Sequence, residues 1–282
     1  MVKLTTTDHS RDVAGLKYIY PVMSRRAGGL SIGINFNTNN ACNWRCVYCQ
    51  VPNLVRGNAP ELDLPMLKKE LSFFLNDVVN GSFYDRFEVP QANRVIKDIA
   101  ISGNGEPTSI DGFDKAISLI GETILKAEIK EHHQFVLITN GSLIHKEQVQ
   151  RGLDLLRKYH GQVWFKLDSA THKGRKTINN MAISEANHLE NLMTSARLCP
   201  TWLQTCLLSV DGQSFDANEL SSYLGLLTVV LEKVKLQGVM LYTLARPSMQ
   251  PEAGRLGTLS EQQLNEFAQA IKHLGLKVRV TV

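Results

Sequence analysis

The chain has 282 residues, of which 43% are hydrophobic and 21% are charged, and its formal net charge is +4. This composition is typical of a folded globular protein and excludes a disordered one, while the mild basicity permits contact with phosphates or nucleic acid without requiring it. No run of about 18 apolar residues predicts a membrane helix, and the first 15 residues lack the apolar segment of a secretory signal. We therefore expect a cytoplasmic protein that has no membrane partner and keeps its cysteines reduced.

Strand-like and helix-like segments alternate along most of the chain. The expected strands cover residues 30–38, 94–102, 134–140, 162–168, 202–210, 238–245 and 277–282. The expected helices, with apolar residues at helical spacing, cover residues 64–81, 111–128, 145–160, 184–198, 217–235 and 260–275. Asp111 is the expected N-cap of the second helix, and Ser260 with Gln263 forms a capping box at the start of the last one. We expect residues 82–93 to form a loop.

This order gives six strand–helix units and one terminal strand, which indicates a parallel sheet with right-handed crossovers. A closed barrel needs eight strands, so the pattern favours an α/β fold with an open, partial (β/α)6 TIM-like barrel and helices outside. An open doubly wound sheet is the alternative. Residues 1–29 are expected to form a less regular N-terminal arm, and residues 30–282 the barrel domain with its short C-terminal strand.

Glycines and polar residues interrupt the apolar pattern directly after the expected strands. These interruptions fall at residues 41–52, 102–108, 139–141, 166–171, 203–212 and 242–247. In a parallel α/β barrel the functional groups lie at the C-terminal ends of the strands. The unusual residues of this chain are therefore expected to gather at one face of the barrel.

The segment CNWRCVYC places Cys42, Cys46 and Cys49 within eight residues. One short loop cannot pair three thiols in disulfides. The C-x3-C-x2-C spacing lets the loop surround one inorganic centre, although structural zinc usually takes four ligands in two separated pairs. A [4Fe–4S] cluster usually takes four cysteines, so three would leave one iron without a protein ligand. Zinc completed by a distant His or Asp, and plain packing cysteines, are the alternatives.

CNWRCVYC resembles the signature of the radical S-adenosylmethionine (radical SAM) superfamily, whose fold is also a partial (β/α)6 barrel. The resemblance implies that the three cysteines hold a [4Fe–4S] cluster and that the amino and carboxylate groups of SAM chelate its fourth iron. It further implies reductive cleavage of SAM to methionine and a 5′-deoxyadenosyl radical that abstracts hydrogen from a substrate. An electron donor such as flavodoxin or ferredoxin is the implied partner.

The same resemblance assigns cofactor contacts near the cysteines. Tyr48, between the second and third cysteines, would lie beside the adenine of SAM. The turn SGNGEPT resembles the family's Gly-Gly-Glu motif, with Asn104 between Gly103 and Gly105. Glu106 or backbone carbonyls of the turn would accept hydrogen bonds from the methionine ammonium. Taken alone, the segment is also compatible with an ordinary strand–helix turn.

Polar residues at the ends of later strands complete the expected cofactor site. The resemblance implies that Asn140, Lys166, Asp168 and Ser169 meet the ribose or the carboxylate of SAM, and that Gln204 faces the same cavity. Asp168 would accept from the ribose and Lys166 would pair with the carboxylate. Their alternation places both on one face of a strand. A buried ion pair is the alternative interpretation of these two residues.

Three further features carry weaker hypotheses. Residues 171–180 form a basic segment, expected to be a solvated loop or a contact for a phosphate-bearing substrate. Tyr242 and Arg246 end the sixth strand, where Arg246 could hold a substrate carboxylate or phosphate. Cys199 and Cys206 have no companions for a second cluster and are expected to pack in the core.

The combination of CNWRCVYCQVP, SGNGEPT and KLDSAT looks closest to a wyosine-synthase-like group of radical SAM oxidoreductases. Archaeal wyosine synthases carry a further cysteine set before the main motif, whereas residues 1–41 contain no cysteine. We therefore expect a single-cluster member. RNA, including tRNA, is one substrate class, and a peptide, a protein site or a small metabolite is another. The third alternative belongs to a different class of protein: a zinc-binding protein without radical chemistry.

Overall fold

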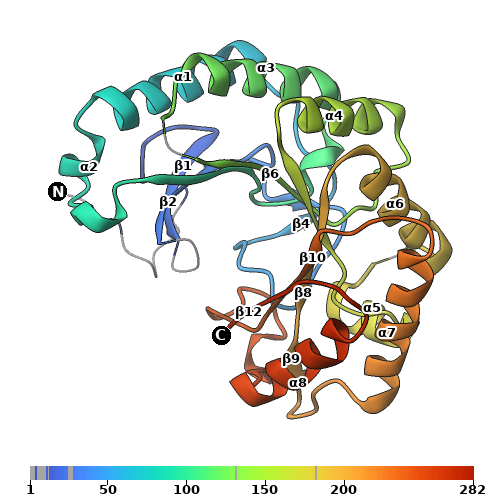
Figure 1. Ribbon diagram of the computed structural model, residues 1–282. Coiled ribbons are helices and arrows are strands. Elements are labelled where there is room, and N and C mark those ends of the chain that lie inside the picture. Colours follow the sequence, from blue (N-terminus) through green and yellow to red (C-terminus); the bar gives the residue numbers. More distant parts are fainter. Residues whose placement is uncertain (1–3, 5–10, 12, 25–27, 131, 182) are drawn as a thin grey trace.

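A curled eight-stranded sheet forms the centre of the protein, and helices cover its outer side (Figure 1). The computed structural model describes residues 4, 11, 13–24, 28–130, 132–181 and 183–282. In spatial order the strands are β1 (Ile19–Ser24), β2 (Gly29–Ile34), β5 (Ile96–Ile101), β6 (Gln134–Thr139), β7 (Gln162–Lys166), β8 (Thr201–Cys206), β10 (Gly238–Tyr242) and β12 (Val278–Thr281). β1 runs antiparallel to β2, and the other neighbouring strands are parallel. β1 and β12 are the edges of the sheet, which confirms an open, partial barrel.

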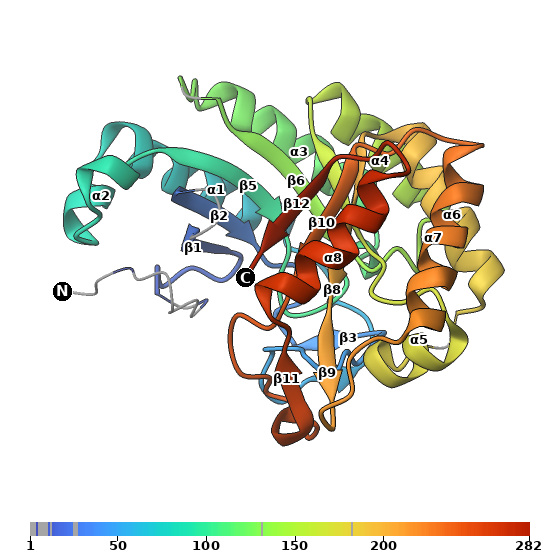
Figure 2. The ribbon, with the colours of Figure 1, turned by 60° about the horizontal axis from the view of Figure 1, so that its bottom comes forward.

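The principal helices lie along the convex side of the sheet, as two views show (Figures 1 and 2). They are α1 (Leu64–Asn80), α3 (Phe113–Lys126), α4 (Glu147–Lys158), α6 (Glu185–Leu198), α7 (Ala217–Leu231) and α8 (Glu261–Lys272). Each buries one stripe; in α1 the stripe includes Leu67, Leu71 and Phe74, which are spaced for one helical face. The capping box at Ser260 is present at the start of α8. Within the described ranges, no helix is both long and apolar enough to cross a bilayer.

The N-terminal segment contributes an edge strand that the sequence analysis did not predict. β1 contains Pro21, which lacks the N–H that a central strand needs but is tolerated at a sheet edge. The ring of Tyr20 lies directly over Gly33 on β2, where a Cβ would come within 2.1 Å of it. The rest of the expected irregular arm falls largely on residues outside those described.

The basic segment at residues 171–180 is a helix, α5 (His172–Asn179), and not the loop that we expected. Thr171 caps it by accepting a hydrogen bond from the backbone N–H of Gly174. The buried residues of α5 are Arg175 and Asn179, both polar. Apolar periodicity therefore could not reveal this helix.

Other boundaries differ for local reasons. The expected strand at 202–210 divides after β8, and its remainder, β9 (Leu208–Val210), pairs with β11 (Leu256–Thr258) in a separate antiparallel sheet. Asp111 does not cap α3; Gly112 occupies that position with φ of 68°, in the left-handed region. Residues 82–93 contain two short helical segments, α2 (Phe83–Arg86) and η1 (Gln91–Asn93).

Candidate functional site

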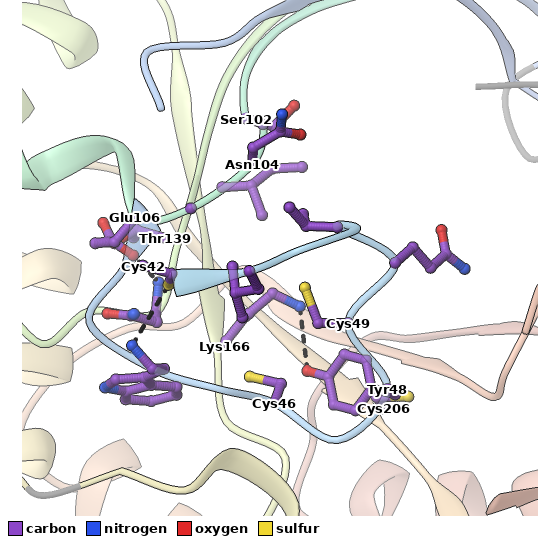
Figure 3. Close-up of a pocket in the computed structure, with 18 of the residues that line it drawn as sticks. Cys42, Cys46, Tyr48, Cys49, Ser102, Asn104, Glu106, Thr139, Lys166 and Cys206 are labelled. Atoms are coloured by element: carbon purple, nitrogen blue, oxygen red, sulfur yellow. Dashed lines mark hydrogen bonds between the residues drawn. The ribbon is translucent and has the colours of Figure 1, made fainter. Parts of the chain in front are cut away.

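A cavity of about 300 Å³ opens at the C-terminal ends of the parallel strands. Cys42, Cys46 and Cys49 all line it, and Figure 3 shows them with residues from the turn after β5 and from the ends of β6, β7 and β8. The end of β10 also contributes to the wall. This is the face on which the sequence pattern placed the polar segments. A cavity of this size, lined by both apolar and polar side chains, is typical of a small-molecule site.

The loop that carries the cysteines is fixed from two sides of the barrel. Its base is a short ladder between β3 (Ala41–Cys42) and β4 (Val55–Arg56). The N–H of Val47 donates to the carbonyl of Ile178 at 2.8 Å, and the hydroxyl of Ser248 donates to the carbonyl of Val47 at 2.6 Å. The sulfur positions are therefore set by backbone bonds to remote segments as well as by the loop itself.

The thiol sulfurs accept hydrogen bonds from nitrogen donors. The N–H of Trp44 donates to Cys42 Sγ at 3.4 Å, and Asn179 Nδ2 donates to Cys46 Sγ at 3.3 Å. Burial raises the pKa of the Cys42 and Cys46 thiols to about 12, so binding a metal centre would release their protons. Donors aimed at sulfur stabilise thiolate ligands and tune iron–sulfur clusters. The surroundings of these cysteines therefore fit a cluster.

The thiols share one cavity without converging on one point. Among the described residues, no group of three or more His, Cys, Asp or Glu side chains is arranged to hold a single metal ion. A zinc site would need its ligands about 2.0 to 2.3 Å from one centre. The described side chains are therefore not preset as a zinc site.

Gly103 and Gly105 let the turn after β5 pack against the start of the cysteine loop. A Cβ on Gly103 would lie 2.1 Å from Asn35 Oδ1, and one on Gly105 would lie 1.9 Å from the carbonyl oxygen of Ala41. Neither contact leaves room for a side chain. Both glycines also line the cavity, so the close contact between the two loops lies at the cavity wall.

Asn104 joins this turn to the same loop. Its backbone N–H donates to Asn35 Oδ1 at 3.0 Å, and its Nδ2 donates to Asn40 Oδ1 at 2.6 Å. Asn40 adopts φ of 56°, in the left-handed region that asparagine tolerates. The residue between the two glycines, whose role the motif leaves open, therefore connects two loops of the site.

Glu106 is buried, and its carboxylate accepts four internal hydrogen bonds, three on Oε1 and one on Oε2. It accepts hydrogen bonds from the hydroxyls of Thr108 and Thr139, both at 2.6 Å, and from the backbone N–H groups of Thr108 and Asn140. Burial raises the pKa of Glu106, and these hydrogen bonds oppose that rise. Glu106 thus braces the ends of β5 and β6, and the cofactor contact expected of its carboxylate would need these bonds to be exchanged.

Asn140 faces the cavity within a polar network. Its Nδ2 donates to Asn43 Oδ1 at 2.9 Å, and its Oδ1 accepts from the hydroxyl of Ser142 at 2.7 Å. Behind it, His188 Nε2 lies 3.0 Å from the Asn140 carbonyl, and the His188 ring packs edge-on against Trp44. Burial lowers the pKa of His188 to about 4, so it is a neutral support and no proton donor at neutral pH. The sequence analysis singled out neither His188 nor Trp44.

Lys166 supplies a half-buried cation to the opposite part of the wall. Its Nζ donates to Tyr242 Oη at 3.1 Å and to Tyr48 Oη at 3.3 Å, as Figure 3 shows for Tyr48. Burial alone would lower the pKa of Lys166, but the neighbouring Tyr242 and Asp168 outweigh it and hold that pKa above its ordinary value. Burial raises the pKa of Tyr48 and Tyr242, so both phenols stay neutral.

Three of the predicted cofactor residues do not line the cavity. Asp168 accepts from Tyr48 Oη at 2.5 Å, from Asn179 Nδ2 at 2.7 Å and from the N–H of Cys206 at 2.8 Å. It lies behind Tyr48 because β7 ends two residues earlier, so strand alternation no longer applies. Ser169 instead bonds the turn before α5, and Gln204 is buried on β8. Their contacts with SAM stay predictions.

The wall also contains residues to which the sequence analysis gave only a weak hypothesis, a different role or no role. Tyr242 and Arg246, at the end of β10, line the cavity as hypothesised. Cys206 lines it too, although a packing role was expected, whereas Cys199 is buried against the carbonyl of Gly161. Arg11 reaches the cavity from the N-terminal arm, for which no motif gave a signal.

No protein-family model matches the chain. A protein of Brachyspira hyodysenteriae named GTPase Obg is 25% identical over 256 residues, which cover 89% of this chain; the chain spans about a third (33%) of that protein. This chain has no G-x-x-x-x-G-K-[ST] phosphate-binding sequence, so the matched region offers no basis for GTP binding.

Solved structures resemble the chain over most of its length. A radical SAM methyltransferase from Sphaerobacter thermophilus has a TM-score of 0.58 and 15% identity, covering 95% of this chain and 70% of that one. TYW1 with a lysine–pyruvate adduct bound has a TM-score of 0.53 and 15% identity, covering 86% and 73%. anSMEcpe with bound AdoMet has a TM-score of 0.54 and 15% identity, covering 89% and 63%. The protein therefore has the radical SAM fold, with Cys42, Cys46 and Cys49 present at its cavity.

Proposed function

We propose that the protein is a radical SAM enzyme in which Cys42, Cys46 and Cys49 hold a [4Fe–4S] cluster with one iron open to SAM. The observation that carries this proposal is that all three thiols of the C-x3-C-x2-C segment face one cavity at the C-terminal ends of the strands of a radical SAM fold. The open coordination position requires a polar, enclosed neighbourhood for the ligand. The glycine turn after β5 and the Lys166 cation supply it.

When bound and reduced, the cluster would supply the electron that cleaves SAM to methionine and a 5′-deoxyadenosyl radical. The protein's own residues bind and orient. In this proposal the backbone carbonyls of residues 103–105 accept from the SAM ammonium, Tyr48 lies beside the adenine, and Lys166 pairs with the carboxylate; all of these residues line the cavity. Buried Trp44 and its neighbours limit water access from behind.

The charges on the cavity wall favour an anionic substrate. Arg11 and Arg246 line it besides Lys166, which this proposal assigns to SAM; among the described lining residues the one carboxylate, that of Glu106, accepts four internal hydrogen bonds. We favour a phosphate-bearing substrate such as RNA, with an anionic peptide or metabolite as the alternative. This choice requires bulk tRNA to bind with a steep dependence on salt, and no binding at low salt would contradict it.

The experiment that tests the radical SAM proposal is anaerobic purification followed by iron and sulfide analysis. We expect about four irons and about four sulfides per chain, and 5′-deoxyadenosine from SAM with dithionite. Cys46→Ser should lose the intact cluster and all 5′-deoxyadenosine, whereas Cys199→Ser, away from the cavity, should keep both. One zinc per chain without sulfide would overturn the proposal and indicate a zinc-binding protein without radical chemistry.

A further inference from the structure

α5 lies against the outer side of the cysteine loop, as the view in Figure 2 shows. The N–H of Val47 donates to the carbonyl of Ile178 at 2.8 Å, and the N–H of Arg45 donates to the carbonyl of Asn179 at 3.2 Å. Two backbone hydrogen bonds thus attach this helix to the segment between Cys42 and Cys49. A partner that binds α5 would sit next to the cluster loop.

The end of α5 also contacts a cluster ligand directly. Asn179 Nδ2 donates to Cys46 Sγ at 3.3 Å. The carbonyl of the next residue, Asn180, accepts from Arg56 Nη2 at 2.5 Å, and Arg56 is exposed. The route from exposed Arg56 to the sulfur therefore runs through two consecutive residues, Asn180 and Asn179, and two hydrogen bonds.

The exposed face of α5 is positively charged. Lys173, Lys176 and Asn180 follow one another at three- and four-residue spacing, which places them in one row along the helix. Both lysines are exposed, and Arg56 lies at the end of the row. We call Arg56, Lys173 and Lys176 the α5 face.

Acidic neighbours do not neutralise the α5 face. In the part of the chain that the structure describes, no ion pair within 4.0 Å joins any of its three cations to a carboxylate. Three nearby acids have other partners: Glu185 pairs with the buried Arg175 at 2.8 Å, Glu252 makes a bidentate pair with Arg45, and Glu219 accepts hydrogen bonds from Ala170 and Thr171 at the start of α5. The face therefore attracts a partner of opposite charge.

We propose that the α5 face docks an acidic one-electron donor protein of the flavodoxin or ferredoxin class, an inference that rests on the proposed function. In the step it serves, the donor is oxidised by one electron and the cluster is reduced by one electron. The rate of electron transfer falls steeply with distance, so a donor must dock close to a cluster ligand. Redox encounters use small, polar interfaces that are steered by complementary charge.

RNA would also be attracted to three cations, but the contacts favour a donor protein. An RNA substrate must reach the cavity, and neither Lys173 nor Lys176 lines it. Arg11 and Arg246 do line it and are better placed for a substrate. What distinguishes the α5 face is its connection to Cys46.

The test compares Lys173→Glu/Lys176→Glu with the matched charge reversal Lys69→Glu/Lys126→Glu, whose lysines are exposed on α1 and α3. Binding of oxidised flavodoxin to the cluster-loaded protein is followed by quenching of its flavin fluorescence. We expect the α5 variant to bind at least about tenfold more weakly at low salt, and the control variant to bind within about twofold of wild type. SAM cleavage driven by flavodoxin should fall in the same proportion in the α5 variant, while cleavage driven by dithionite stays unchanged.

Each alternative result has a distinct meaning. Equal flavodoxin binding by both variants and wild type would overturn the docking proposal. Loss of tRNA binding in the α5 variant, with unchanged flavodoxin binding, would overturn it in favour of an RNA surface. Failure of wild type to cleave SAM even with dithionite would instead refute the proposed function, and the binding titration would still test the α5 face.

Discussion

Two charges on the cavity wall, the buried Glu106 and the half-buried Lys166, are held in opposite ways. Glu106 is 2% exposed, and four donors from the ends of β5 and β6 occupy its carboxylate. Lys166 is bound by two neutral phenols, those of Tyr48 and Tyr242, at 3.3 and 3.1 Å. An ammonium has three N–H donors, so the described contacts leave Lys166 one for a ligand.

This difference in internal partners distinguishes a charge that stabilises the fold from a charge that can bind a ligand. A carboxylate whose acceptor sites are filled by fixed donors holds those donors in place and offers little to a ligand. A cation with an unused donor at a cavity is placed to bind an anion. Charge and burial alone do not distinguish the two cases; the number of internal partners does.

Replacing Glu106 should give the largest effect, and it should fall on stability. Glu106→Ala leaves two hydroxyls and two backbone N–H groups without their acceptor in the interior, so we expect the free energy of unfolding to drop by about 3 kcal/mol. Urea unfolding followed by circular dichroism measures this. Glu106→Gln, which keeps one carbonyl oxygen, should lose less. If the free energy of unfolding of Glu106→Ala stays within about 1 kcal/mol of the wild-type value, the four donors find other partners. The contrast drawn between Glu106 and Lys166 would then be wrong.

Replacing Lys166 should act on binding instead. Lys166→Met keeps the bulk but removes the cation, so we expect the dissociation constant for SAM to rise about 10- to 100-fold, the loss of one charge-assisted hydrogen bond. Equilibrium dialysis with the cluster-loaded protein measures this, and the free energy of unfolding should change by less than about 1 kcal/mol. Unchanged SAM affinity with a large loss of stability would mean that Lys166 serves only as the partner of Asp168 and Tyr242.

Periodicity predicted most of the fold because most elements bury an apolar face. The seven parallel strands and the six helices on the outer side were predicted in this way. β1 and α5 were missed for physical reasons. β1 contains Pro21, which is compatible with a strand only at an edge, and α5 is held by buried polar groups such as Arg175 and not by an apolar stripe.

The site was predictable where its chemistry is local in sequence. The spacing of the three cysteines places them at one cavity, and the glycine turn lies beside it. The partners of Glu106 and Asp168 could not be predicted, because Thr139 is 33 residues from Glu106, and Tyr48 is 120 residues from Asp168. A motif names a carboxylate, but only the tertiary fold shows whether other side chains have already filled it.

Replacing Asp98 on β5 should give the smallest change in stability. Asp98 provides a second buried carboxylate, with fewer donors, to compare with Glu106. Like Glu106 it is buried, but its described side-chain partner is the single hydroxyl of Ser31. Burial therefore raises the pKa of Asp98 to about 6 from 3.8. Because the folded state holds this proton more tightly than the unfolded state, the stability from this group is present below about pH 4 and is lost as pH rises through about 6.

Asp98→Asn removes that titration. The shift corresponds to at most about 3 kcal/mol, and the weaker bond from Ser31 offsets part of it, so we expect a net gain of about 1 kcal/mol at pH 7.5. Urea unfolding from pH 4 to 7.5 should show a flatter profile for the variant than for wild type. Ser31→Ala, which removes the described donor, should lower stability at pH 7.5. Parallel pH profiles for wild type and Asp98→Asn would show that burial without donors does not penalise this carboxylate, and the four hydrogen bonds to Glu106 would then lose their energetic explanation.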